Sequence, residues 1–202
     1  MILETPRLLL RDFTNNRRDM NDLVTNLNNE GIADNLSDVP YPYTPESAKK
    51  FLRECARESK EYPRRFYNVG MELKETGRII GCLELAIDEH EQDKAAGVSF
   101  WQGPGYCGKG YMGEALQKWF KFAYDDLNLR RLEAVADINN VKSRKLLTQL
   151  GMREEGISLE NYVSISNGQM HDIAYYALLK REYKEIEASL PGRFAPKPKI
   201  TI

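Results

Sequence analysis

Apolar residues recur at every third or fourth position between Met112 and Leu127, and this spacing predicts one buried face of a helix. Directly before that helix, residues 103–110 include Gly103, Gly105, Gly108 and Gly110. The segment before the glycines, residues 95–101, is an apolar run that predicts a short buried strand. The chain is therefore organised around a strand, a glycine-rich loop and a helix that follow one another directly.

Similar patterns predict further elements on both sides of this centre. Runs of apolar and β-branched residues predict strands at residues 7–13, 66–73, 78–88 and 130–137, with two more inside residues 153–180 on either side of the Asn167-Gly168 turn. Helical spacing predicts helices over residues 17–30, 45–60, 140–150 and 181–186. The three prolines and missing periodicity of residues 189–202 predict a C-terminal tail.

Composition narrows the class of protein. A chain of 202 residues with 42% hydrophobic and 29% charged residues fits one globular domain. Its net charge of −1 argues against a partner that is a nucleic acid or an anionic membrane. The three cysteines have no metal-like spacing and indicate a reducing compartment, so we expect a cytoplasmic protein without a metal. No apolar run is long enough to predict a signal peptide or a membrane span.

The glycine-rich loop is a candidate phosphate site. A loop that feeds a helix leaves backbone N–H groups unpaired at the positive end of that helix, and glycines let an anion approach them. One interpretation is a nucleotide triphosphate loop, because Gly103, Gly108 and Lys109 have the G-x-x-x-x-G-K spacing. That loop needs Ser or Thr next, and here the residue is Gly110; Pro104 also removes a backbone donor. A magnesium-dependent nucleotide enzyme is therefore the weaker interpretation.

The second interpretation is a pyrophosphate loop for coenzyme A. Residues 107–112 resemble the Arg/Gln-x-x-Gly-x-Gly/Ala loop of the GNAT acetyltransferases, and Tyr111-x-x-Glu-Ala-Leu after it is also similar. The resemblance implies that six residues bind the cofactor here: Cys107, Gly108, Lys109, Gly110, Tyr111 and Met112. Cys107 and Met112 depart from the pattern. Because such a loop binds phosphate mainly through backbone N–H groups, these departures are expected to change affinity more than the mode of binding.

Other segments carry the same resemblance. From the residues alone, Asn140-x-x-Ser143 is a helix-capping pattern. In the GNAT family the same pattern, ending in a Leu-Gly-Phe-like turn, implies that Asn140 contacts the pantetheine arm. It also implies that Ser143 lies near the thioester sulfur as a candidate general acid. The opening segment from Glu4 to Arg11 is similar to the branch of this family that acetylates ribosomal-protein N-termini.

The resemblance extends from about residue 4 to residue 180 and implies a fold. We expect an α/β (α+β) protein with a mixed, mostly antiparallel central sheet of six to seven strands, flanked by about four helices. Two central strands would be splayed, with Phe100, Trp101 and Gln102 on the edge that pairs with pantetheine. Residues 1–188 would form one domain and residues 189–202 a tail. The sequence is also compatible with a homodimer.

The implied activity is transfer of an acetyl group from acetyl-CoA to a primary amine, on a protein N-terminus or a small molecule, by direct attack in a ternary complex. We expect Glu84 or Glu133 as the general base, with Asp137, Glu160 or a water chain as alternatives. Ser164 stands where some members of the branch have a carboxylate. A non-catalytic acyl-CoA-binding module is the other interpretation, because of the residues at positions 107, 112 and 164.

Three further patterns allow both a functional and a structural interpretation. Tyr41-Pro42-Tyr43 is either a wall of the acceptor site or a packed loop. The acidic turn at residues 89–93, with His90, is more typical of a solvated hairpin tip than of an amine site. His171 and Asp172 are neighbours on a predicted strand, so they point to opposite faces and are not expected to act as a dyad.

Overall fold

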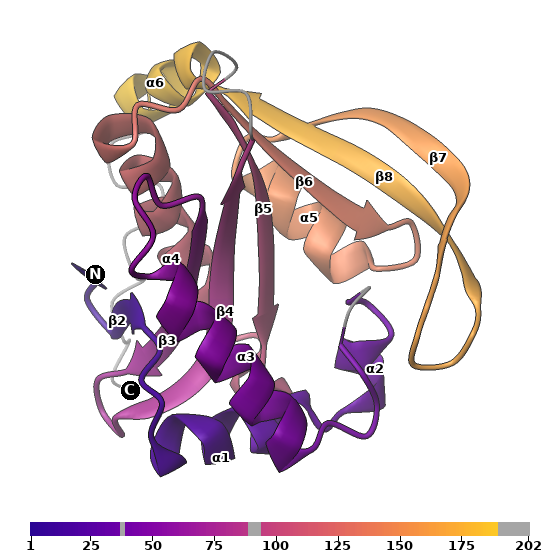
Figure 1. Ribbon diagram of the computed structural model, residues 1–202. Coiled ribbons are helices and arrows are strands. Elements are labelled where there is room, and N and C mark those ends of the chain that lie inside the picture. Colours follow the sequence, from indigo (N-terminus) through magenta and orange to yellow (C-terminus); the bar gives the residue numbers. More distant parts are fainter. Residues whose placement is uncertain (37–38, 89–93, 190–202) are drawn as a thin grey trace, which may run out of the picture.

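The computed structural model describes residues 1–36, 39–88 and 94–189. In these residues one eight-stranded sheet has the strand order β1-β2-β3-β4-β5-β6-β8-β7, with helices on both faces (Figure 1). Its strands are β1 (Ile2–Glu4), β2 (Leu8–Asp12), β3 (Phe66–Leu73), β4 (Arg78–Ile87), β5 (Ala95–Gln102), β6 (Arg131–Asp137), β7 (Arg153–Val163) and β8 (Met170–Leu179). The helices are α1 (Arg17–Leu27), α2 (Glu30–Ala33), α3 (Pro45–Glu58), α4 (Tyr111–Lys121), α5 (Val141–Gln149) and α6 (Lys180–Ser189).

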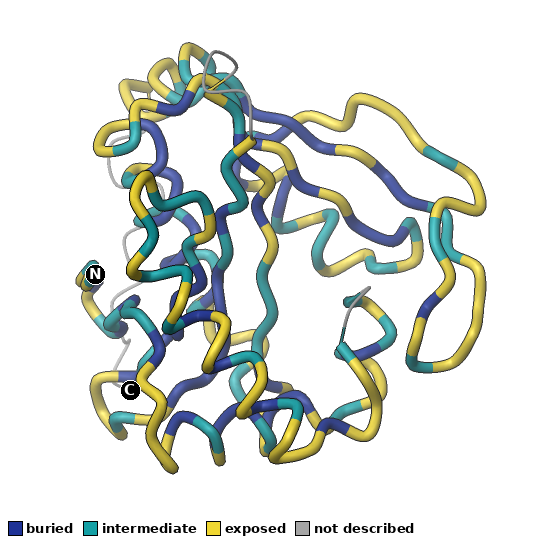
Figure 2. Tube along the Cα trace, in the orientation of Figure 1, coloured by how far each residue is buried: buried dark blue, intermediate teal, exposed yellow. Residues whose placement is uncertain are grey.

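Two hydrophobic cores lie on the two faces of the sheet. The larger core joins α4 and α5 to the central strands and includes Trp119, Phe120 and Leu147. The smaller core packs α1 and α3 against Ile79 and Cys82 of β4. β4, in the middle of the sheet, is mostly buried, whereas β7, which forms one edge of the sheet, is mostly exposed, as Figure 2 shows. Successive residues of a strand point to opposite faces, so β4 supplies both cores.

The sheet is splayed between β5 and β6. These strands form its parallel pair, and they pair only where Ala95, Ala96 and Gly97 face residues 131–133. Beyond this point the two ribbons diverge, as Figure 1 shows. On its other edge β5 stays paired with β4 as far as Gln102. The second half of β5 therefore has a free edge toward β6, which is the splay that the sequence resemblance implied.

The predicted fold class is confirmed, and the described residues add to the predicted elements. The sheet has eight strands and not six or seven, because β1 pairs with β2 although it is only three residues long. Six α-helices replace the predicted four, partly because residues 17–30 do not form one helix. Instead, α1 ends at Leu27, and the side chain of Asn29 caps α2 by accepting from the Ile32 N–H group at 3.2 Å. Neither short element has a detectable hydrophobic period.

The start of the glycine loop is tightly packed against α1. A Cβ atom added at Gly103 would lie 1.9 Å from Asn26 Oδ1, and the Asn26 side chain is itself fixed by hydrogen bonds to the Asp22 and Ile79 carbonyl oxygens. We expect Gly103→Ala to lower the free energy of unfolding by about 1–3 kcal/mol, the usual cost of overpacking. Denaturant unfolding measures this change. Gly105→Ala is the control, since a Cβ there meets nothing within 4 Å; equal stability of the two variants would contradict the prediction.

No helix within the described residues is both long and apolar enough to cross a membrane.

Candidate functional site

The glycine-rich loop has a backbone that only glycine adopts easily. Gly103 ties the end of β5 to β4 by donating its N–H to the Ile80 carbonyl oxygen at 2.9 Å. A short 3₁₀ turn, η1 (Pro104–Tyr106), follows. Gly108 and Gly110 then have φ angles of +76° and +78°, in the left-handed region where a Cβ atom causes strain. Gly110 is also the N-cap of α4 and provides no capping side chain.

The loop leaves its backbone donors available. Cys107 donates its N–H to the Pro104 carbonyl oxygen at 3.2 Å, inside the 3₁₀ turn. The next five N–H groups, those of residues 108–112, have no hydrogen-bond acceptor among the residues that the structure describes. A Cβ atom added at Gly108 would meet nothing within 4 Å, so the backbone there is open to a ligand. Unpaired donors at a helix N-terminus fit an anion such as a diphosphate.

The side chains of this loop point in several directions. Met112 is only 8% exposed and belongs to the larger core, so at this position only the backbone is presented to a ligand. The Cys107 thiol is exposed. Lys109 has its ammonium nitrogen 5.7 Å from the centre of the Tyr106 ring. The unusual residue at position 112 is therefore explained by packing of α4.

The N-terminal segment holds the loop and α4 together. Glu114, in the first turn of α4, accepts hydrogen bonds from the Thr5 hydroxyl at 2.6 Å, the Arg7 backbone N–H at 2.8 Å and Arg7 Nε at 2.6 Å. Arg7 Nη1 also donates to the Lys109 carbonyl oxygen at 2.9 Å. These contacts fix the loop from the side of β2. These contacts were not predicted from the sequence, because no local pattern links residues about a hundred positions apart.

The start of α5 lies at the other side of the splay. Asn140 Oδ1 accepts from the Ser143 N–H at 3.1 Å, so the capping interpretation of Asn140 is confirmed. Its Nδ2 donates to Asn35 Oδ1 at 2.8 Å, which joins α5 to the segment after α2. Ser143 is half-buried in the first turn of α5. The contact between Asn35 and Asn140 was also not predicted from the sequence.

The free edge of β5 carries the other predicted cofactor residues. Phe100, Trp101 and Gln102 pair with Leu83, Cys82 and Gly81 of β4 through one edge only. The Phe100 side chain packs against the larger core and Trp101 against the smaller one. Their outer backbone groups face the splay, in the region where an extended ligand could pair with a strand.

The two leading base candidates share one face of the sheet. Glu84 alternates with Leu83 and Leu85 of the larger core, so it points to the face that α1 and α3 cover. Glu133 likewise alternates with buried residues of β6 and points to the same face, at the last position where β6 still pairs with β5. Glu84 is half-buried, whereas the Glu133 side chain is 53% exposed.

The surroundings of Glu133 are rich in charge. Arg131 Nε donates to Glu133 Oε1, and Arg131 also forms an ion pair with Glu155. The pKa of Arg131 is raised, first by its hydrogen bond with Glu155 and then by that with Glu133. The Arg131 guanidinium holds the pKa of Glu155 below its ordinary value. Glu133 is therefore part of an exposed ion-pair network.

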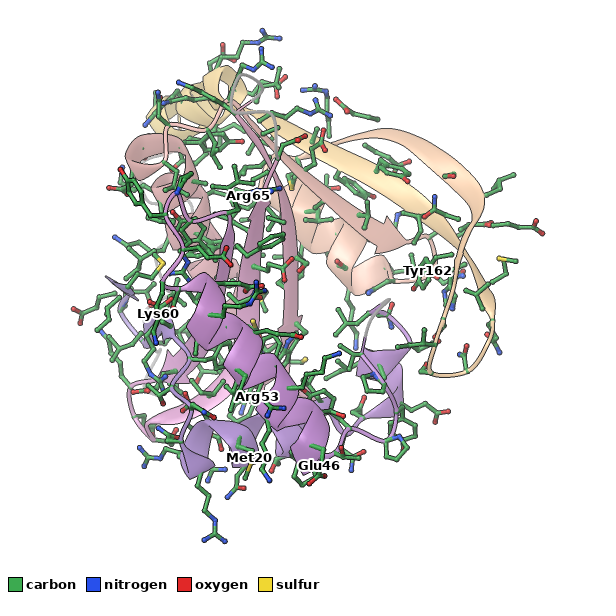
Figure 3. The ribbon with its side chains drawn as sticks, viewed as in Figure 1. Met20, Glu46, Arg53, Lys60, Arg65 and Tyr162 are labelled. Carbon is green, nitrogen blue, oxygen red and sulfur yellow. The ribbon has the colours of Figure 1, made fainter. Side chains whose placement is uncertain are left out.

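A cluster of polar side chains around His171 lies beside the end of β6. His171 Nδ1 hydrogen-bonds with Asp137 Oδ2, its Nε2 is 3.5 Å from Asp34 Oδ1, and its ring stacks on Tyr162 at 4.9 Å. Tyr162, labelled in Figure 3 on the β7–β8 side, donates its hydroxyl to the Asp34 carbonyl oxygen at 3.2 Å. The Asp137 carboxylate is therefore hydrogen-bonded to His171, and the β7–β8 hairpin is linked to the end of α2.

Asp172, Glu160 and Ser164, the other polar residues singled out in this part of the sequence, lie outside the cluster around His171. Asp172 accepts from the Glu160 N–H at 2.7 Å and does not pair with His171, as the strand geometry predicted. Glu160 is exposed. Ser164 is 1% exposed, and its hydroxyl lies 2.9 Å from that of Ser166.

The structure describes one of the two remaining segments, Tyr41-Pro42-Tyr43, but not the acidic turn. Tyr43 is 5% exposed in the smaller core and Tyr41 is 43% exposed, so Tyr43 at least is a packing residue. The acidic turn at residues 89–93 lies outside the described residues, as does the tail from residue 190 onward. Within the described ranges, no group of three or more His, Cys, Asp or Glu side chains is arranged to hold a metal ion.

Comparison with known proteins identifies similar sequences. A family model described as an acetyltransferase (GNAT) domain matches residues 7–153. The Bacillus licheniformis protein named "Uncharacterized N-acetyltransferase p20" is 35% identical over 111 residues, which are 55% of this chain and 61% of that protein. The match thus spans less than two thirds of this relative's length.

Solved structures show the same fold at low sequence identity. A ribosomal-protein-alanine acetyltransferase of Vibrio fischeri has a TM-score of 0.77 and 20% identity, over 91% of this chain and 98% of that chain. RimL, a ribosomal alpha-N-protein acetyltransferase in complex with coenzyme A, has a TM-score of 0.77 and 19% identity, over 89% and 98% of the two chains.

Proposed function

This chain belongs to the acetyltransferase (GNAT) family, and on that premise we propose that it transfers an acetyl group from acetyl-CoA to a primary amine. The observation that carries the proposal is the row of N–H groups at residues 108–112, which have no acceptor within the described residues and lie at the N-terminus of α4. Backbone donors and the helix dipole together stabilise a diphosphate there. The splay between β5 and β6 would receive the rest of the cofactor.

The proposed reaction is a direct attack of the amine on the thioester. Acetyl-CoA supplies the activated acetyl group, and positioning of the two substrates provides much of the rate increase. The free edge of Phe100, Trp101 and Gln102 would orient the pantetheine arm, with Asn140 at the start of α5. Ser143 would give a proton to the departing sulfur. No cysteine nucleophile is needed, and Cys55 and Cys82 are buried thiols whose pKa values burial raises.

Glu84 is the stronger of the two base candidates. An amine must lose a proton to attack, and a half-buried carboxylate beside the splay can accept it, directly or through one water. We expect Glu84→Gln to lower kcat/KM for the amine about 100-fold at neutral pH. The loss should shrink at high pH, where the free amine is already neutral. Steady-state kinetics over a range of pH values measures both effects.

Glu133→Gln is the matched control, because Glu133 lies on the same face but is exposed and paired with Arg131. We expect its kcat/KM to stay within about threefold of the unchanged protein, since exposed ion pairs contribute little. A larger loss for Glu133→Gln than for Glu84→Gln would reverse the assignment. No loss in either variant would remove both residues from the base role.

The acceptor is proposed to be the free α-amine of a protein N-terminus. RimL is named as a ribosomal alpha-N-protein acetyltransferase, and the Vibrio fischeri protein is named as a ribosomal-protein-alanine acetyltransferase. A small-molecule amine is the alternative. A cytoplasmic location, a homodimer and a domain limit near residue 188 stay predictions of the sequence.

Release of free thiol from acetyl-CoA tests the proposal. The protein would be incubated with peptides that have a free N-terminus, the same peptides with a blocked N-terminus, and small diamines. Thiol release that requires the free N-terminus supports the proposed acceptor, and release with diamines alone selects the small-molecule class. Binding of CoA without turnover on any amine would favour the non-catalytic module that Cys107, Met112 and Ser164 suggested. Absence of both binding and turnover would contradict the proposal.

A further inference from the structure

The phosphate loop lacks a cationic or amide side chain at its first position. The GNAT pattern has Arg or Gln there, and this chain has Cys107, whose sulfur lies 3.7 Å from the Gly103 carbonyl oxygen. The remaining cation within residues 107–112 is Lys109. A diphosphate is strongly anionic, so another cation close to the loop would strengthen its binding.

Arg7 brings a guanidinium group to this loop from the segment just before β2. Its Nη1 donates to the Lys109 carbonyl oxygen at 2.9 Å, and its Nε donates to Glu114 Oε2 at 2.6 Å. The guanidinium carbon also lies 4.5 Å from the centre of the Tyr111 ring. Three partners on α4 and its preceding loop therefore hold the guanidinium plane in one orientation.

The third guanidinium nitrogen lies close to the helix N-terminus. A Cβ atom added at Gly110, the N-cap of α4, would lie 3.5 Å from Arg7 Nη2. Nη2 has no hydrogen-bond partner within the described ranges, and the Arg7 side chain is 35% exposed. A guanidinium carries five donors in a planar fork, so Nη2 keeps donors for an oxyanion at the end of α4.

Glu114 shows why a cation is needed at this place. Its side chain is 5% exposed and belongs to the first turn of α4, next to the N–H groups of residues 108–112, where a negative charge would repel a phosphate. Arg7 forms an ion pair with it, and two neutral donors, the Thr5 hydroxyl and the Arg7 backbone N–H, complete its hydrogen bonds. Glu114 thus anchors the guanidinium without using all of its donors.

We propose that Arg7 is a cofactor-binding residue, which contacts the diphosphate of CoA through Nη2 and supplies the side-chain contact that Cys107 does not. This inference rests on the proposed function, because it assumes that residues 108–112 bind that diphosphate. The competing explanation is structural: Arg7 would only join the N-terminal segment to α4. The two explanations predict different responses to a donor that lacks the diphosphate.

Arg7→Gln would be compared with the unchanged protein using acetyl-CoA and acetyl-pantetheine, which has the thioester but no diphosphate. We expect KM for acetyl-CoA to rise about 10- to 100-fold, the usual effect of losing a hydrogen bond to a charged group. The kcat at saturation, and kcat/KM for acetyl-pantetheine, should stay within about threefold. Arg7→Lys keeps a charge but not the fork, so a smaller rise in KM is expected.

Arg11→Gln is the matched control. Arg11 lies in β2 and forms ion pairs with Asp19 and Glu72, away from the loop. We expect it to lower the melting temperature but to leave KM for acetyl-CoA unchanged. Melting curves of all variants report folding, and Arg7→Lys still decides the question if Arg7→Gln does not fold.

Equal losses with both donors, or KM for acetyl-CoA within threefold of the unchanged protein in both Arg7 variants, would overturn the inference and leave Arg7 a structural role. If the unchanged protein itself neither binds CoA nor turns over acetyl-CoA, the proposed function fails first. These two failures are therefore distinguishable.

Discussion

Gly108→Val is expected to reduce CoA affinity by at least about 100-fold. Gly108 has a φ angle of +76°, and a β-branched residue is strained there by roughly 1–3 kcal/mol. The backbone would relax away from this angle and turn the N–H groups of residues 108–110 out of line. Losing two hydrogen bonds to a charged group corresponds to about 3 kcal/mol or more, hence the 100-fold estimate. Titration calorimetry with CoA measures the change, and circular dichroism verifies the fold.

Gly105→Val is the matched control in the same loop. Gly105 is not at a positive φ angle, and a Cβ atom there meets nothing within 4 Å. We expect this variant to bind CoA within about threefold of the unchanged protein. Similar affinities for Gly108→Val and Gly105→Val would show that the conformation at Gly108 is not needed for binding.

Ser143→Ala is expected to lower kcat about 100-fold and to leave KM for acetyl-CoA nearly unchanged. Loss of a general acid that protonates the leaving sulfur has an effect of this order. The substitution removes only the hydroxyl. The Ser143 backbone N–H, which donates to Asn140 Oδ1, remains, so the cap of α5 is kept. Steady-state kinetics at saturating amine provides both constants.

Thr148→Ala is a control for the helix itself. Thr148 lies in the last turn of α5, is exposed, and donates its hydroxyl to the Arg144 carbonyl oxygen. Thr148→Ala therefore also removes a hydroxyl from α5, but at the opposite end of the helix from Ser143. We expect its kcat to be unchanged. If Ser143→Ala kept kcat within about threefold, another group or water would protonate the sulfur.

The elements with strong local patterns were predictable from the sequence. The strand at residues 66–73 was predicted with the bounds that β3 has, because its pattern ends just before the Glu75-Thr76-Gly77 turn. The helix from Pro45 was predicted from its cap, and the Thr44 side chain does accept from the Ser47 N–H at 3.2 Å. Family membership was also predictable, since residues 107–112 and the Tyr111-x-x-Glu-Ala-Leu segment resemble the GNAT loop, and the family model confirms it.

Contacts between distant segments were not predictable in this way. Arg7 and Glu114 lie in two separate segments that resemble the family, but they are 107 positions apart, and nothing in the sequence indicates that they pair. The His171 cluster joins residues from β8, β6 and the end of α2, and the sequence offered only the adjacent Asp172 as a partner. Such pairs depend on sheet order and register, which hydrophobic periodicity does not specify.

The central claim is that the N–H groups of residues 108–112 bind the diphosphate of CoA. A crystal structure of the protein with CoA measures this most directly. We expect diphosphate oxygens at hydrogen-bond distance, about 3 Å, from these backbone nitrogens, with the pantetheine arm along residues 100–102 and its sulfur beside Ser143. CoA bound at another surface, or a loop whose N–H groups are bonded to the protein itself while CoA is present, would contradict the account.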